Sequence, residues 1–403
     1  MPKTAIQHIS SLTALSNAWK VLDSHARGRA RNGSGVDNES INAFAANTDR
    51  NLRTIQSELH DTLPYSFQLL RPILIPKTNG KYRVICIPTV RDRIVQRALI
   101  NYLSAGDRCH LANKVSYGFI PERGVRKAIN RAKNLRRKKA WAYKTDITTF
   151  FDTISRSILQ EAIKHEVRSH SLHDLLIAAS DCELERPDNE SRRVAISNQG
   201  IRPGMGVRQG MPLSPFFSNL VLKNFDKSVE QANFKMVRYA DDLIIFASSE
   251  QECLDVHAFC KSELGKIKLA VPEIGDKSKT IIYHPTDIVE FLGVGIKPDN
   301  RDITGYSLQI LKPQFKEIRN KFLHLADMAH LRHEQLTLTQ LGRRLDGMIA
   351  AYLGSYDYCD NVAKLEENLL FWKNETLSRI YKNELGIDVD KLTDDQRHFL
   401  GIA

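Results

Sequence analysis

The chain has 403 residues and a formal net charge of +11, and 42% of its residues are hydrophobic against 26% charged. This composition is typical of a globular protein with two or three packed subdomains. No run of about 18 apolar residues and no leader pattern occurs, which predicts a cytoplasmic protein with no membrane partner. The six cysteines form no C-x-x-C pair, so neither a structural zinc nor a disulfide framework is expected.

The excess of positive charge favours a polyanionic partner, nucleic acid above all. Basic side chains crowd into one helix-like segment, which holds Arg126, Lys127, Arg131, Lys133, Arg136, Arg137, Lys138 and Lys139. Because this segment leads into a strand that ends in an acidic residue, we interpret it as a track for a phosphate backbone. A solvated helix face is the alternative.

The first half of the chain is predicted to be mixed helix and strand. In order, the elements are a helical region at 1–60, strands at 73–77 and 82–88, a helix at 90–102 and a strand at 141–147. Ser40 is predicted to cap a helix in the first region. Asn79 and Gly80 are predicted to form the hairpin turn between the first two strands.

The second half continues the mixture. In order, the elements are a helix at 154–180, a polar turn-rich stretch at 181–205, a helix at 214–230, strands at 234–238 and 243–247, a helix at 250–269, strands at 281–283 and 290–296, and helices from about 311 onwards. Strands and helices do not alternate strictly. The pattern therefore predicts an α+β fold, with helices on one face of an antiparallel sheet, rather than a doubly wound parallel sheet.

The turn between the strands at 234–238 and 243–247 is Tyr239-Ala240-Asp241-Asp242. Two adjacent carboxylates repel each other, a bound divalent cation removes that repulsion, and oxygen ligands suit Mg²⁺. A surface turn is the alternative, because Asp is common in turns. Asp146 ends another strand, and if the two strands are neighbours, three carboxylates converge as a two-metal phosphoryl-transfer site requires.

A series of motifs in one order identifies the family that the chain resembles. They are residues 35–44, 75–83, 87–96, 116–119, 146–152, 209–215, 239–242, 279–280 and 291–293. In this order they resemble bacterial, group II intron-like reverse transcriptases over about residues 20–300. The resemblance implies a right-hand polymerase with an N-terminal helical extension at 1–65, fingers with part of the palm at 66–140, the palm at 141–300 and a helical thumb at 301–403.

The resemblance also implies the roles of the carboxylates. Asp146 and Asp241 would bind two Mg²⁺ ions directly, and Ile147 would add its backbone carbonyl. Asp242 would be a weaker third ligand. Alternatively, its carboxylate would lie behind the metal ligands and act only through its charge. Tyr239 would contact the primer terminus, and Arg136 and Arg137 the primer or template.

The nucleotide pocket is implied in the same way. Lys81 and Arg83 would hold the triphosphate, with Lys77 as a weaker candidate, and Gln209 and Gly210 would approach the nucleotide. Lys279 would protonate the leaving pyrophosphate, although Lys277 is close enough to be confused with it. Phe151 would exclude the 2′-hydroxyl and so select dNTPs, whereas the neighbouring Phe150 is predicted to fill the core.

Departures from the intron enzymes refine the expectation. No H-N-H or zinc-finger pattern and no Asn-Ala-x-x-His or Val-Thr-Gly retron signature is found, and residues 342–358 resemble the thumb helices of intron-type enzymes. The chain most resembles stand-alone antiphage defence reverse transcriptases. We therefore expect an RNA-directed DNA polymerase that copies a structured non-coding RNA into cDNA in antiphage defence. A retron-like or intron-derived enzyme with another role, or an RNA-binding maturase-like protein, is the alternative, and oligomeric state is not indicated.

Overall fold

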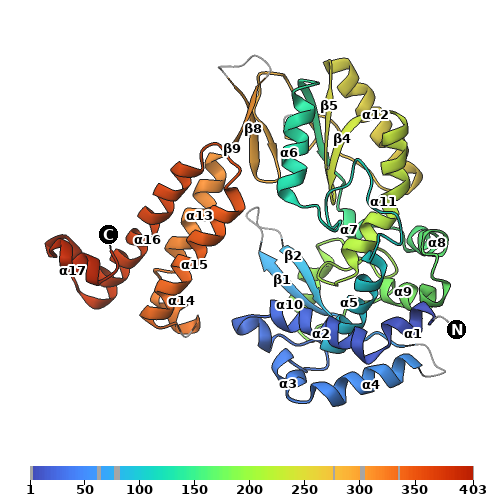
Figure 1. The fold of residues 1–403 in the computed structure, drawn as a ribbon, viewed down its shortest axis with the longest axis horizontal. Helices are drawn as coiled ribbons and strands as arrows, with labels where there is room; N and C mark the ends of the chain where they lie inside the picture. The colour runs from blue at the N-terminus through green and yellow to red at the C-terminus, as the bar shows by residue number, and fades with distance from the viewer. Residues whose placement is uncertain are drawn as a thin grey trace. The chain divides into compact units, whose positions relative to one another are not determined.

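The computed structural model describes residues 3–60, 65–76, 82–275, 277–299, 305–334 and 336–402. They form a mixed α+β fold whose strands pair antiparallel in three hairpin regions (Figure 1), as predicted. The chain divides into two compact units, Met1–Ala128 with Tyr143–Ile282, and Ile129–Ala142 with Tyr283–Ala403. The four-part division into extension, fingers, palm and thumb stays a prediction. No helix of the described residues is both long enough and apolar enough to span a bilayer.

The N-terminal helices pack around one apolar cluster. They are α1 Ala5–Ile9, α2 Leu12–His25, α3 Ile41–Ala46 and α4 Thr48–His60. The predicted cap is confirmed, since the Ser40 side chain accepts the N–H of Ala43. Trp19 of α2 packs against Phe44 of α3, with 4.7 Å between the ring centroids. Helix α2 also lies along α5 (Val90–Ser104), which follows the first hairpin.

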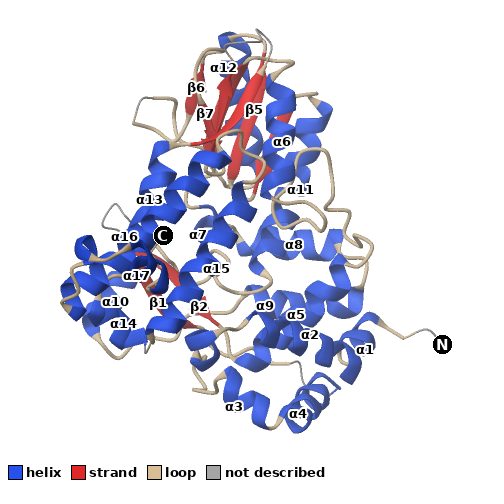
Figure 2. Ribbon diagram, turned by 60° about the vertical axis from the view of Figure 1, so that its left-hand side comes forward, coloured by secondary structure: helices blue, strands red, loops and turns tan. Residues whose placement is uncertain are grey.

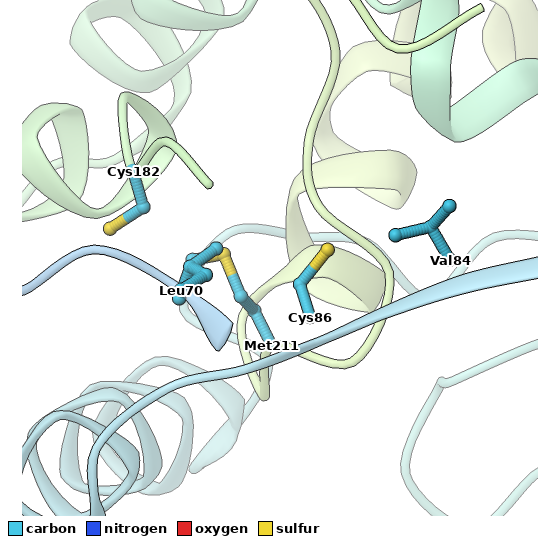
Figure 3. Packing of buried hydrophobic residues seen from close by; sticks show 5 residues of the cluster. All are labelled: Leu70, Val84, Cys86, Cys182 and Met211. Atoms are coloured by element: carbon cyan, nitrogen blue, oxygen red, sulfur yellow. The ribbon is translucent and has the colours of Figure 1, made fainter. Parts of the chain in front are cut away.

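That hairpin consists of β1 Arg71–Pro76 and β2 Tyr82–Ile87, paired antiparallel. Its predicted Asn-Gly turn, together with Lys77 and Lys81, lies outside the described residues. The hairpin is fastened to distant segments by a buried cluster of Leu70, Val84, Cys86, Cys182 and Met211 (Figure 3). Because Met211 follows Gln209 and Gly210, this cluster places the predicted nucleotide-pocket loop against β2.

The central sheet has the strand order β4-β5-β3-β6. Its strands are β3 Trp141–Asp146, β4 Lys235–Tyr239, β5 Asp242–Ala247 and β6 Ile281–Tyr283. The strand that ends at Asp146 is therefore the neighbour of the strand that begins at Asp242, which is the condition that the sequence left open. Helices α11 (Ser214–Gln231) and α12 (Glu250–Lys266) pack beside this sheet.

Two predicted segments between β3 and β4 differ from the structure. They contain α7 Phe150–Thr153, α8 Arg156–Glu166, α9 His173–Ser180 and α10 Glu190–Ser197. The single helix expected at 154–180 is interrupted because Val167 is extended, with φ −91° and ψ 101°. The expected loop at 181–205 contains α10, capped by Asn189. Sequence reasoning missed α10 because only Ile196 of it is buried, so no apolar stripe marks it.

The last part of the chain combines a small sheet with helices. These elements are β7 Val289–Phe291, β8 Val294–Pro298, β9 Tyr306–Ile310, α13 Lys312–His324, α14 Met328–Glu334, α15 Leu338–Tyr356, α16 Val362–Leu385 and α17 Asp394–Phe399. The single strand expected at 290–296 is a hairpin, since Leu292 and Gly293 take positive φ of 51° and 79° and reverse the chain. Figure 2 shows that the N-terminal and C-terminal segments are mostly helical. Phe322 of α13 and Trp372 of α16 anchor the C-terminal helices.

Candidate active site

The catalytic-turn candidate is a two-residue hairpin loop. Tyr239 pairs with Asp242 across β4 and β5, so Ala240 and Asp241 alone form the loop, and Ala240 takes a φ of 56°. The N–H of Ile147 donates to the carbonyl of Asp241 at 3.1 Å. This bond fixes the turn to the end of β3, directly after Asp146. The structure thus brings the three carboxylates of the sequence prediction together at one end of the sheet.

The carboxylates carry a large electrostatic cost. Burial, followed by repulsion from Asp241, raises the pKa of Asp242 to about 6, although Lys144 opposes the shift. Burial and the charge of Asp146 also raise the pKa of Asp241, while Lys279 and Arg83 act in the opposite direction. Repulsion between these groups means that a cation bound among them would stabilise the folded protein.

The residues present fit divalent metal ions. Asp146 Oδ1 is buried without a hydrogen-bond partner, while Asp146 Oδ2 forms an ion pair with the Lys279 ammonium group. Within the described parts of the chain, no group of three or more His, Cys, Asp or Glu side chains encloses an ion by itself. Mg²⁺ sites in phosphoryl-transfer enzymes use one or two carboxylates with substrate phosphates and water, so the donor set is of the right kind.

The raised pKa of Asp242 predicts how stability depends on pH without metal. A neutral Asp242 stabilises the folded state fully below pH about 4, and that contribution is lost as pH rises through about 6. Asp242→Asn should therefore stabilise the metal-free protein at pH 8 by on the order of 2 kcal/mol. Urea unfolding in EDTA measures this difference, and it should shrink towards zero at pH 4. An equal difference at both pH values would contradict the assignment.

A buried ion-pair network holds the catalytic turn, and sequence reasoning did not find it. Arg238 is fully buried and donates to both carboxylate oxygens of Asp226, at 2.7 and 2.5 Å. The same guanidinium donates to the Ala240 carbonyl at 3.1 Å and to Asn219 Oδ1 at 3.0 Å. Asn219 in turn donates to the Gly118 carbonyl. The carbonyl at the turn is therefore tied to helix α11, on which Asp226 and Asn219 lie.

Gly118 fits against the turn because it lacks a side chain. A Cβ there would lie 2.5 Å from the Ala240 nitrogen. The segment before it runs along β4, where the N–H of Tyr117 donates to the Arg238 carbonyl and the N–H of Arg238 donates to the Val115 carbonyl, both at 2.8 Å. This explains the Ser-Tyr-Gly-Phe motif at 116–119, which covers the free edge of β4 and supports the turn.

Three of the nucleotide-pocket candidates line one cleft of 670 Å³ within the first unit. Lining residues include Arg83 of β2, Thr149, Asp152, Gln199, Gln209 and Lys279. Helix α10 supplies one wall, and Gln199 after it accepts the N–H of Tyr82 at 3.3 Å, which links this wall to the start of β2. Arg83 and Lys279 therefore share a cleft with Gln209, and their contacts with a nucleotide stay predictions.

The two aromatic residues at 150 and 151 divide as expected in burial. Phe150 is 2% exposed and belongs to the core, whereas Phe151 is only partly buried. The carbonyl of Phe151 accepts the N–H of Val207 at 2.8 Å, and Gly206 takes a φ of 77° beside it. The loop that leads to Gln209 is thus attached directly to the predicted sugar gate.

Gly210 is required by its surroundings. Its φ is 108°, and a Cβ would lie 2.6 Å from the Cys86 carbonyl oxygen, while the Cys86 N–H donates to the Gln209 carbonyl at 2.7 Å. Gly210→Ala should therefore displace this loop, costing about 1–3 kcal/mol of stability and raising the KM for dNTP about tenfold or more. Steady-state kinetics measures this. Gly265→Ala, whose Cβ meets nothing within 4 Å on α12, is the control and should leave the KM unchanged without loss of stability.

Arg136 corrects one sequence prediction. Its side chain is fully buried and donates to the carbonyls of Ile296, His284, Pro285 and Asp287. It also stacks on Tyr306, with its central carbon 4.6 Å from the ring centroid. Because these contacts bury the guanidinium completely, it cannot contact primer or template. The sequence prediction was wrong because the periodicity of a basic helix does not show which of its cations points inward. Arg137 is exposed, and its contact with nucleic acid stays a prediction.

Two further candidates stay predictions. Tyr239 is half-buried at the end of β4, and its ring lies 6.1 Å from that of Phe119, which is 52% exposed. Lys279, rather than Lys277, is the lysine that contacts Asp146. The structure therefore favours Lys279 for the role in which the sequence left the two lysines open.

Comparison with known proteins identifies the family. The family model described as reverse transcriptase (RNA-dependent DNA polymerase) matches residues 75–296, more than half of the chain. The chain therefore belongs to the reverse transcriptase family.

Individual relatives are distant. Protein YkfC of Escherichia coli K12 is 28% identical over 306 residues, which cover 64% of this chain and 74% of YkfC. The retron Ec83 reverse transcriptase of Escherichia coli is 25% identical, over 58% of this chain and 66% of that protein. The group II intron-encoded protein LtrA of Lactococcus lactis is 24% identical, over 52% of this chain and 33% of LtrA. The chain thus spans only a third of the length of LtrA.

Proposed function

We propose that Asp146, Asp241 and Asp242 form the metal centre of an RNA-directed DNA polymerase that extends a primer with dNTPs. The observation that carries this proposal is that the end of β3 and the catalytic turn are hydrogen-bonded to each other. The Ile147–Asp241 backbone bond holds Asp146 and Asp241 together, and the repulsion between them and Asp242 calls for a cation. Few other groups are needed, because positioning and charge stabilisation supply most of phosphoryl-transfer catalysis.

Each residue then has a defined task. Asp146, Asp241 and the Ile147 carbonyl would hold two Mg²⁺ ions, with Asp242 beside them. When bound, the ions activate the primer 3′-hydroxyl and stabilise the charge that develops on the leaving pyrophosphate. Lys279, now paired with Asp146, turns to the pyrophosphate and gives it a proton.

The cleft residues orient the nucleotide. Arg83 presents a planar fork of donors to the triphosphate, and Gln209 faces the base and sugar, while Gly210 lets the Gln209 loop approach β2 closely. Phe151 occupies the space below the sugar and excludes a 2′-hydroxyl. The shared cleft supports the assignments of Arg83 and Gln209, and the resemblance of the motifs supports all of them. Lys81 lies outside the described residues and keeps its proposed role of holding the triphosphate.

The template is proposed to be a structured non-coding RNA, copied into cDNA in the cytoplasm as part of antiphage defence. The net charge of +11 supports an RNA partner, and the resemblance to stand-alone defence enzymes supports the role. Tyr239 and Arg137 remain the proposed contacts with primer and template.

Sequencing the nucleic acid that co-purifies with the protein from its native locus tests this proposal. After addition of Mg²⁺ and labelled dNTPs, we expect one structured RNA and DNA complementary to part of it, with no DNA from Asp241→Asn. Heterogeneous RNA without DNA from either protein would contradict the proposal and favour the RNA-binding, maturase-like alternative.

A further inference from the structure

The most basic part of the chain surrounds α6 (Val125–Arg136). From residue 123 to residue 145 the sequence holds ten Lys or Arg residues and no Asp or Glu. Such a one-sided run needs either neutralising partners within the fold or a polyanion outside it. Residues Ile129–Ala142 of this run belong to the second compact unit, whereas the three carboxylates belong to the first.

Arg136 fixes the end of α6 to the small sheet. Its guanidinium donates to the Ile296 carbonyl at 2.6 Å and to the Asp287 carbonyl at 2.7 Å, and it lies over the Tyr306 ring. These contacts use backbone oxygens and a π face, so they neutralise no charge. Their effect is to hold α6 rigidly against β8 and β9, which determines where the neighbouring cations point.

Two of those cations share a cleft with a third cation from β8. Lys133 and Arg137 are four residues apart and so lie on the same side of α6, and Lys297 faces them from β8. The cleft has a volume of 570 Å³, and Ser307 and Gln309 of β9 add hydrogen-bonding side chains. We call it the α6 cleft.

Two acidic residues line the α6 cleft as well. Asp360 Oδ2 is committed to the N–H of Leu308 at 2.6 Å, and Asp299 lies at the end of β8. Arg131 and Lys138 are also exposed and add positive charge to this end of α6. The balance at the cleft and its margin therefore stays positive.

We propose that the α6 cleft binds the phosphate backbone of a double-helical RNA segment. The lining offers ammonium, guanidinium, hydroxyl and amide donors, which are the groups that contact nucleic-acid phosphates. Single-stranded RNA is held by stacking on exposed aromatic rings, but Tyr306, the one aromatic residue lining this cleft among the described residues, is 7% exposed and covered by Arg136. A duplex, recognised through its backbone, fits this surface better.

The inference rests on the proposed function only for the choice of RNA as the nucleic acid. It adds a second place at which the enzyme holds the RNA, through a helical region of that RNA. The carboxylates act at the growing end of the DNA that is made on this RNA, whereas the α6 cleft retains the folded part of the RNA.

The test uses the full-length double variant Lys133→Gln with Lys297→Gln. Its binding to an RNA hairpin of about 20 base pairs should weaken about tenfold at physiological salt, and the slope of log affinity against log salt should fall by about two, one for each lost phosphate contact. Extension of oligo(dT) on poly(rA), a simple template without folded regions, should keep its KM and kcat. The matched control is Lys20→Gln with Lys164→Gln, which removes two exposed charges from α2 and α8 and should change neither measurement.

Four other outcomes overturn the inference. Unchanged hairpin binding shows that the α6 cleft holds no RNA. An equal loss of hairpin affinity in the control variant shows that the effect depends on net charge and not on this cleft. A parallel rise of KM on poly(rA)–oligo(dT) assigns the cleft to the template–primer track instead, and an effect on a DNA duplex but not on the hairpin assigns it to the product. Wild-type protein that is inactive both on poly(rA)–oligo(dT) and on the RNA from its native locus would refute the proposed function and leave the hairpin result to stand separately.

Discussion

Replacing Asp241 by Asn is expected to lower the rate of DNA synthesis on an RNA template by about 10³-fold or more, equivalent to roughly 4 kcal/mol of transition-state stabilisation. The substitution keeps the size of the side chain but removes the charge that would bind metal. The fold should survive, because the carbonyl of Asp241, not its side chain, bonds to Ile147. In metal-free buffer the variant should even be slightly more stable, since the pKa of Asp241 is raised by burial and by Asp146.

Single-turnover primer extension measures the rate, and binding of the template–primer is measured in parallel. Asp255→Asn is the matched control, because Asp255 is exposed on α12 and takes part only in a helix-surface bond with Gln251. We expect the control to behave as wild type and Asp241→Asn to bind template–primer normally. If Asp241→Asn kept more than about a tenth of the wild-type rate, the metal-centre assignment would be wrong.

The second large effect concerns the ion pair behind the turn. Asp226→Asn leaves the Arg238 guanidinium buried without its countercharge, and breaking such a pair costs about 3–5 kcal/mol. Urea unfolding should show this loss. Glu317→Gln, which breaks the exposed pair with Lys321 on α13, is the control and should change stability little.

A double variant separates stability from positioning. Asp226→Leu with Arg238→Met removes both charges and should recover most of the lost stability, because apolar side chains of similar volume can replace a buried pair. It cannot restore the hydrogen bond from Arg238 to the Ala240 carbonyl. We therefore expect a stable protein whose kcat and apparent Mg²⁺ affinity remain reduced at least about tenfold. Full activity in the double variant would show that the network is only structural.

Much of this site could be predicted from short-range sequence patterns. The runs on either side of Tyr239 and Asp242 are apolar and β-branched, so the hairpin and its acidic turn are visible without any tertiary information. The helix that begins at Ser214 was found from its apolar stripe, and the structure places it at Ser214–Gln231. Ser40 was recognised as a cap because its role depends only on the next turn of chain.

What the sequence concealed depends on distant contacts. Arg136 and Arg137 are adjacent and chemically identical, yet one is buried under four carbonyls and the other is exposed. Arg238 precedes the acidic turn, but its partner Asp226 lies on helix α11, and the sequence around either residue does not indicate the pair. Helix α10 was missed because only Ile196 of it is buried, while Ser191, Val194 and Ala195 line an open cleft instead of a core.

The most direct measurement is primer extension by the purified wild-type protein on an RNA template, with dNTPs and with rNTPs, in Mg²⁺ and in EDTA. Our account predicts DNA complementary to the template in Mg²⁺ and dNTPs, at most traces with rNTPs, and none in EDTA. A folded protein that binds the template–primer but makes no DNA in Mg²⁺, or that makes as much product in EDTA, would contradict the claim that these carboxylates hold the metal ions of a reverse transcriptase.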